Sequence, residues 1–116
     1  MSTDISFEDV SENFRHISIS GRLDILGSDS IALKFTSLAV AAQRRVVVDL
    51  TAVSFLASIG IRAIISNAKA LQQRGGKMVL FVGDNAAVIK TLEATGIDTL
   101  IPMFTDAAAS DKAALA

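Results

Sequence analysis

The residue with the most scope for chemistry in this chain is Ser58, which stands where a strongly apolar run gives way to a helical pattern. Residues 46–48 are continuously apolar and predict a buried strand; residues 49–60 leave it, cross a short loop and enter a helix. In an open parallel sheet, loops at the carboxyl ends of strands meet ligands and partners. A hydroxyl at this helix start can cap the helix or accept a phosphate.

Capping is the commoner role for a serine at such a position, and it contributes about 1 kcal/mol. A phosphate is also tolerated there, because free N–H groups and the helix dipole favour negative charge. Phosphorylation adds about −1.5 to −2 units of charge. Burying that charge unpaired in an interface costs several kcal/mol. Since about 1.4 kcal/mol is tenfold in affinity, Ser58 phosphorylation would weaken binding about a hundredfold or more without unfolding the domain.

The helix that follows Ser58 is amphipathic. Its apolar face, which should pack on the sheet, holds Ile61, Ile64, Ile65, Ala68 and Leu71. The opposite face is polar and holds Arg62, Ser66 and Lys69. Ile59 falls on the polar side beside Ser58, so it is a candidate contact for a partner protein.

An enzymatic interpretation would use Asp24, Asp49 and Ser58 as a hydrolase set. Activation of the nucleophile needs an adjacent base, and the one histidine, His16, lies on an early strand. The absence of Cys excludes a cysteine nucleophile, a disulfide framework and a thiolate zinc site. The loop at residues 83–85 lacks the glycine pattern of a phosphate-cradling loop. We therefore expect a binding protein with no catalytic residues, metal or cofactor of its own.

Composition narrows the class of partner. The net charge of −1 argues against binding to duplex nucleic acid, and 5% aromatic residues argue against base stacking. Residues 1–9 are polar and acidic, unlike a signal peptide. The apolar runs fall well short of the ~20 residues of a membrane span. We expect a cytoplasmic location and no membrane insertion.

An α/β domain has to position Ser58. A length of 116 residues fits one domain, residues 1–116. Strands are expected at 5–10, 14–20, 46–48, 78–82 and 99–103, the last at an edge because it contains Pro102. Helices are expected at 28–42, 58–74, from a cap in 83–85 to Gly96, and in the Ala-rich segment 105–116. Ser28 and Thr105 are the expected caps, and Gly21 should end the second strand. The prediction is a mixed, mostly parallel sheet of about 4–5 strands with about four helices.

Three segments, in order, are similar to the signature of STAS domains of the anti-sigma factor antagonist type. Residues 49–60, DLTAVSFLASIG, resemble a buried strand ending Asp-Leu-Ser, then an aromatic, then Asp-Ser-Ser-Gly or Asp-Ser-Thr-Gly opening a helix. Residues 21–24, GRLD, resemble the family's Gly-x-Leu-Asp, and residues 92–97, LEATGI, its Leu-x-x-Thr-Gly-Leu. The resemblance covers nearly the whole chain.

The resemblance implies that Ser58 is the phosphate acceptor, that Asp24 belongs to the neighbouring loop and that Gly60 allows close approach. The implied partner surface comprises Asp24, Ser54, Phe55, Ala57, Ser58, Ile59, Gly60 and Arg62. The implied partner is an anti-sigma factor that is also a serine kinase and itself holds ATP and magnesium. Unphosphorylated antagonist binds this kinase and frees the sigma factor, and a serine phosphatase removes the mark.

Two departures from the family pattern leave a second function open. Ala57 replaces the usual Asp, and Ile59 replaces the second hydroxyl, so Ser58 is the one acceptor that remains in the motif. The alternative is an adaptor or scaffold that is never phosphorylated, such as the small STAS subunit of a lipid-transport ATPase or of a stress-signalling assembly. Asp24 also keeps two interpretations, as a turn residue or as part of the partner surface.

Overall fold

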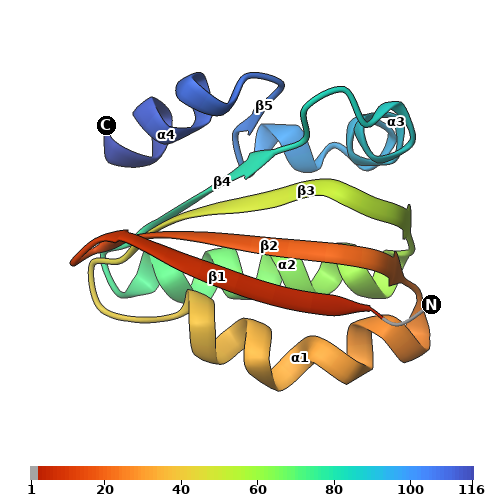
Figure 1. Cartoon of the computed structure of the whole chain (residues 1–116), viewed down its shortest axis with the longest axis horizontal. Helices are drawn as coiled ribbons and strands as arrows, with labels where there is room; N and C mark the ends of the chain where they lie inside the picture. The colour runs from red at the N-terminus through yellow and green to blue at the C-terminus, as the bar shows by residue number, and fades with distance from the viewer. Residues whose placement is uncertain (1–2) are drawn as a thin grey trace.

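The aliphatic runs of the sequence form a five-stranded sheet in the computed structural model, which describes residues 3–116 (Figure 1). The strands are β1 (Asp4–Ser11), β2 (Phe14–Leu23), β3 (Arg45–Leu56), β4 (Lys77–Phe81) and β5 (Met103–Phe104). They lie side by side in chain order; β1 and β2 are antiparallel and the other pairs are parallel. The predicted mixed, mostly parallel sheet is confirmed. Met1 and Ser2, part of the polar N-terminal stretch, lie outside the described residues.

Helices cover both faces of this sheet. They are α1 (Ile25–Ala39), α2 (Ser58–Gln73), α3 (Ala86–Thr95), the short 3₁₀ helix η1 (Ile97–Thr99) and α4 (Ala107–Leu115). Successive side chains of β3 point to opposite faces. Val46 and Val48 pack in the large core with α1, α2 and α3, whereas Val47 packs with Phe14, Val79 and Ala114 of α4. The central strands are therefore buried on both sides, as their unbroken apolar sequence predicts.

The second strand extends further than predicted. Gly21 does not end it, because β2 continues to Leu23. Gly21 has a φ of +91°, which glycine adopts at little cost. Irregularities on both sides of Gly21 let pairing with β3 resume, so that Ser20 faces Ala52 and Leu23 faces Leu56. The strand thus bends without losing its partner.

The predicted start of the first helix at Ser28 is wrong. The helix begins at Ile25, and Asp24 caps it by accepting the Gly27 N–H at 2.8 Å. Ser28 is instead a buried residue inside α1. Both Asp and Ser are good caps, and the stripe of apolar residues alone did not distinguish them. The helix also ends before Ala42, which is exposed.

The loop predicted before Ser58 is mostly strand. β3 runs to Leu56, so Thr51 and Ser54 are strand residues and Ala57 alone separates β3 from α2. The extension persists because β3 keeps pairing with β2 beyond its last partner on β4, Phe81. Ser58 therefore follows directly from the end of a long strand.

The C-terminal elements are shorter than predicted. The expected strand over residues 99–103 is η1 followed by a two-residue β5, and Pro102, which has no N–H to donate, precedes β5. Its position at the sheet edge is confirmed. Thr105 does not cap α4, because Asp106 does so by accepting the Ala109 N–H at 2.9 Å.

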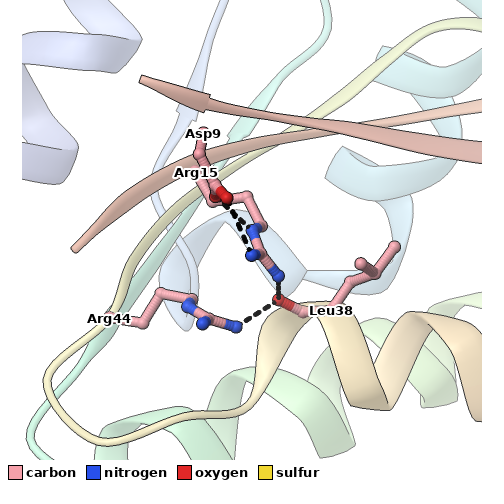
Figure 2. A network of polar contacts seen from close by, with 4 residues as sticks. All are labelled: Asp9, Arg15, Leu38 and Arg44. Carbon is pink, nitrogen blue, oxygen red and sulfur yellow. Dashed lines mark hydrogen bonds and ion pairs between the residues drawn. The ribbon is translucent and has the colours of Figure 1, made fainter. Parts of the chain in front are cut away.

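A charged network holds the C-terminal end of α1 (Figure 2). The Leu38 carbonyl accepts hydrogen bonds from Arg15 at 3.0 Å and from Arg44 at 2.8 Å. Arg15 also binds Asp9 through two bonds of 2.6 and 3.1 Å, and these bonds lower the pKa of Asp9. Guanidinium groups stabilise the exposed carbonyls of a helix end. The network fixes α1 to the β1–β2 hairpin.

Candidate functional site

The carboxyl ends of β2 and β3 meet the starts of α1 and α2 at one end of the molecule (Figure 1). The Ala57 N–H donates to the Leu23 carbonyl at 3.0 Å, which joins the residue before α2 to the last residue of β2. Asp24 and Ser58 are the next residues along the two segments. The structure therefore brings the two sequence motifs that contain them into contact.

Ser58 is the first residue of α2, not its cap. Ala57 has the extended backbone of a cap residue, with φ −90° and ψ 168°, and its carbonyl accepts from the N–H groups of Gly60 and Ile61 at 3.0 and 3.1 Å. Its methyl side chain cannot accept a hydrogen bond. The start of α2 thus has no side-chain cap, whereas Asp24, Asn85 and Asp106 cap α1, α3 and α4.

The Ser58 side chain is exposed and makes no hydrogen bond within the described residues. The backbone N–H groups of Ser58 and Ile59 have no acceptor there either. Such N–H groups are the orphan donors of a helix start. Phosphate oxygens on Ser58 could accept from them.

Gly60 brings the start of α2 against the end of β2. A β-carbon at Gly60 would lie 2.9 Å from Leu23 Cβ and 3.0 Å from Leu56 Cδ1. Any larger residue would push α2 away from the sheet. The glycine of the motif therefore fixes where Ser58 stands relative to β2.

Asp24 has a structural role as the cap of α1. Its carboxylate accepts the Gly27 N–H and also pairs with Arg22 at 3.2 Å. The bond from Gly27, followed by that from Arg22, lowers the pKa of Asp24. The side chain remains partly exposed, so the capping carboxylate also contributes negative charge to the surface near Ser58.

Apolar side chains reach solvent around the two helix starts. The exposed fractions are 43% for Phe55, 70% for Ile25 and 82% for Leu26. The Arg22 guanidinium lies 4.5 Å from the centre of the Phe55 ring, and Ser54 beside it is exposed. An apolar surface with a polar rim is typical of a protein-binding site.

Ile59 is half-buried, and so less exposed than its position on the helical wheel predicts. Helix side chains lean toward the N-terminus, which accounts for partial burial at the strand–helix junction. Arg62, like Ser66 and Lys69 further along α2, is exposed as predicted. Arg62, one turn after Ser58, therefore belongs to the surface that begins at Ser58, whereas Ser66 and Lys69 lie further along the helix.

Asn85 supports this site in a way that sequence reasoning missed. Its side-chain oxygen caps α3 by accepting the Val88 N–H at 3.3 Å. Its amide also donates to the carbonyls of Leu50, Thr51 and Val53, at 3.1, 3.3 and 2.8 Å. The sequence indicated a cap in this loop, but not the contact with β3. Asn85 thus fixes the part of β3 that leads to Ser58.

The residues of the hydrolase interpretation that the sequence analysis set aside are not brought together. Asp49 accepts from the Thr51 hydroxyl and N–H at 2.6 and 2.8 Å, and the strand that separates it from Ser58 spans roughly 20 Å at about 3.3 Å per residue. His16 binds Asp111 of α4 at 2.8 Å.

Within residues 3–116, no three His, Asp or Glu side chains are grouped to hold a metal. No helix there has the length and apolarity to cross a membrane.

A family model described as the STAS domain matches residues 9–109 of the chain. No curated protein matched the sequence. The family match spans β2 to β5 together with α1, α2 and α3, omits residues 4–8 of β1, and includes every residue of the candidate site.

Several solved structures share the fold. An anti-sigma factor antagonist from Mycobacterium paratuberculosis is 22% identical, with a TM-score of 0.84 over 99% of this chain and 96% of that one. The anti-sigma factor antagonist SpoIIAA in its unphosphorylated form is 20% identical, with a TM-score of 0.72 over 95% and 96%. The phosphorylated form of SpoIIAA from Bacillus is 19% identical, with a TM-score of 0.66 over 95% and 99%.

Proposed function

The chain belongs to the STAS domain family, and on that basis we propose that it is an anti-sigma factor antagonist switched by phosphorylation of Ser58. The position of Ser58, exposed at the uncapped start of α2, carries the proposal. The shared fold supports it, because SpoIIAA has been solved with and without its phosphate.

The proposed partner is an anti-sigma factor that is also a serine kinase. The unphosphorylated chain binds this kinase and frees the sigma factor. The Ser58 oxygen then attacks the γ-phosphorus of ATP, ADP leaves, and the hydroxyl proton passes to a base of the kinase. ATP and magnesium belong to the kinase, so the chain needs no cofactor and catalyses nothing. A serine phosphatase reverses the step, and all of this takes place in the cytoplasm.

The physical basis of the switch is a charge placed in an apolar contact. Phe55, Ile25 and Leu26 provide the exposed apolar surface around Ser58. A phosphate there brings about −1.5 to −2 charges that the partner would have to bury. Since several kcal/mol correspond to two or more orders of magnitude in affinity, binding is lost. The phosphate should also stabilise the folded domain. The first turn of α2 contains no acidic residue to repel it, and the N–H groups there are free to bind it.

The test uses each serine-kinase anti-sigma factor encoded in the same genome, purified and mixed with the full chain. Mass spectrometry after incubation with Mg-ATP should place one phosphate on Ser58, and Ser58→Ala should abolish it. By calorimetry, Ser58→Asp should weaken binding at least tenfold. This effect is smaller than the hundredfold expected for phosphate, because the carboxylate carries less charge. Ser66→Asp is the matched control, because Ser66 is an exposed serine further along α2.

The replacement of the family's usual Asp by Ala57 favours the second function, a STAS adaptor or scaffold that is never phosphorylated. That function predicts no phosphate on Ser58 with any kinase, and equal partner affinities for the wild type and Ser58→Asp. A phosphate found on Thr51 or Ser54 instead of Ser58 would contradict the proposed switch as well.

A further inference from the structure

Arg62 lies one turn after Ser58 on the exposed side of α2. A helix makes neighbours of residues that are four apart, with their β-carbons about 5–6 Å from each other. Side chains in a helix also lean toward its N-terminus, so the guanidinium of Arg62 extends over the turn that begins at Ser58. A group attached to the Ser58 oxygen is therefore within reach of Arg62.

The charge of Arg62 has no partner within the described part of the chain. Its guanidinium forms no ion pair and no hydrogen bond with any side chain or carbonyl of residues 3–116. Its own helix offers no carboxylate either, because residues 58–73 include neither Asp nor Glu. The cation that adjoins Ser58 on α2 is thus free to bind an anion.

The other arginine near Ser58, Arg22 of β2, already has partners. Its guanidinium donates to the Asp24 carboxylate at 3.2 Å and lies 4.5 Å from the centre of the Phe55 ring. Arg22 and Asp24 thus compensate each other's charge. Of the two arginines, Arg62 is the one with no anion bound to it among residues 3–116.

The order of Ser58 and Arg62 along α2 suits an ion pair. An anion one turn before a cation stabilises a helix better than the reverse order, because each charge then lies toward the end of the helix dipole that favours it. A phosphate on Ser58 would carry about −1.5 to −2 charges. Its oxygens can accept two parallel N–H groups of one guanidinium, which is a stronger pairing than a single hydrogen bond.

We propose that Arg62 binds the phosphate of phosphorylated Ser58 and holds it over the first turn of α2. Arg62 is then a positioning residue for the modified side chain. The inference rests on the proposed function, since it concerns the phosphorylated state of Ser58. The pairing fixes where the added charge lies on the surface, and it occupies a guanidinium that is free in the unphosphorylated chain.

The test uses the full chain with phosphoserine built in at position 58 during synthesis, so that no kinase is involved. A phosphorus NMR titration at low salt measures the second pKa of the phosphate, which is about 6 in the absence of neighbouring charges. An opposite charge nearby lowers that pKa. Arg62→Gln should therefore raise it by about 0.3 or more. The Nε–H signal of Arg62 should also move as the phosphate ionises.

Two further variants distinguish a local ion pair from the general charge of the helix. Arg62→Lys keeps a cation one turn after Ser58, so it should restore part of the lowered phosphate pKa. Lys69→Gln is the matched control, because it removes another exposed cation of α2. Lys69 lies about 16 Å from Ser58 along the helix axis, beyond the screening length of about 8–10 Å at physiological salt, and should not change the pKa.

Three results would each overturn the pairing: the same phosphate pKa with and without Arg62→Gln, an equal change in Lys69→Gln, or no recovery in Arg62→Lys. An Arg62 Nε–H signal that ignores the phosphate titration would do so as well. None of these results bears on whether a kinase modifies Ser58. A kinase assay that leaves Ser58 unmodified would contradict the proposed function and leave the measured pairing unchanged.

Discussion

At the scale of single residues, Asp24 combines a capping carboxylate with a surface charge. It accepts the first-turn N–H of Gly27 and pairs with Arg22, and both bonds favour the ionised form. The pKa of Asp24 in the folded chain therefore lies below its ordinary value of 3.8. An acid with a lowered pKa stabilises the fold at a pH above its unfolded pKa, and this stabilisation is lost as the pH falls through the folded pKa.

Asp24→Asn tests this contribution, since asparagine also caps helices but carries no charge to pair with Arg22. The wild type should be more stable than Asp24→Asn at neutral pH, and the difference should shrink as the pH falls below about 3.8. Urea denaturation at a series of pH values measures it. Asp29→Asn, which removes an exposed carboxylate of α1, should show no comparable narrowing. A difference that widens on acidification would contradict the assignment.

Asn85 is the second residue whose side chain does two things at once. Asn85→Ala should destabilise the chain by about 2 kcal/mol, because it removes a helix cap and leaves the carbonyls of Leu50 and Val53 without their donor. Thermal and urea unfolding measure the loss. Asn85→Asp keeps the capping oxygen but places a carboxylate oxygen against the carbonyl oxygens of β3, so it should be no more stable than the alanine variant. Wild-type stability in Asn85→Asp would show that the contacts with β3 contribute nothing.

At the scale of elements, α2 is the helix whose start lacks a side-chain acceptor. Ala57→Asp should supply that acceptor and raise the free energy of unfolding by about 1 kcal/mol, or a few degrees in Tm for a domain of this size. Ala57→Asn should give a similar gain without charge. Ser66→Asp places the same carboxylate beyond the first turn and should give no gain. Were Ala57→Asp neutral, Ala57 would not be the cap position.

The elements also show what the sequence could and could not predict. Hydrophobic pattern located the central strands and the two faces of α2, because burial determines where apolar side chains lie. The predicted ends of elements were wrong where tertiary pairing determines them. β3, for example, extends to Leu56 because β2 lies beside it. The prediction of the residue that caps α1 also failed, because Asp24 and Ser28 are both favourable cap residues and the local sequence does not distinguish them. The contact of Asn85 with β3 joins distant segments, so no local pattern could reveal it.

At the scale of the whole molecule, the two ends of the sheet have different surfaces. The carboxyl end combines Ser58 with exposed apolar residues such as Ile25 and Leu26, whereas Arg45 and Lys77 begin their strands at the amino end. α4 lies on the other face of the sheet from α1 and α2, and His16 and Arg45 bind it there. Because Ser58 begins α2 on the opposite face, a charge added there should leave the packing of α4 unchanged.

A chain that carries phosphoserine at position 58, introduced during synthesis, tests the effect of the phosphate without a kinase. The phosphate meets free N–H groups and disturbs no buried side chain, so Tm should equal or exceed that of the unmodified chain. Amide shifts should be confined to residues 22–27 and 54–62, which adjoin the start of α2, and residues 107–115 of α4 should not respond. A lowered Tm, or shifts throughout α4, would mean that phosphorylation changes the fold instead of one surface.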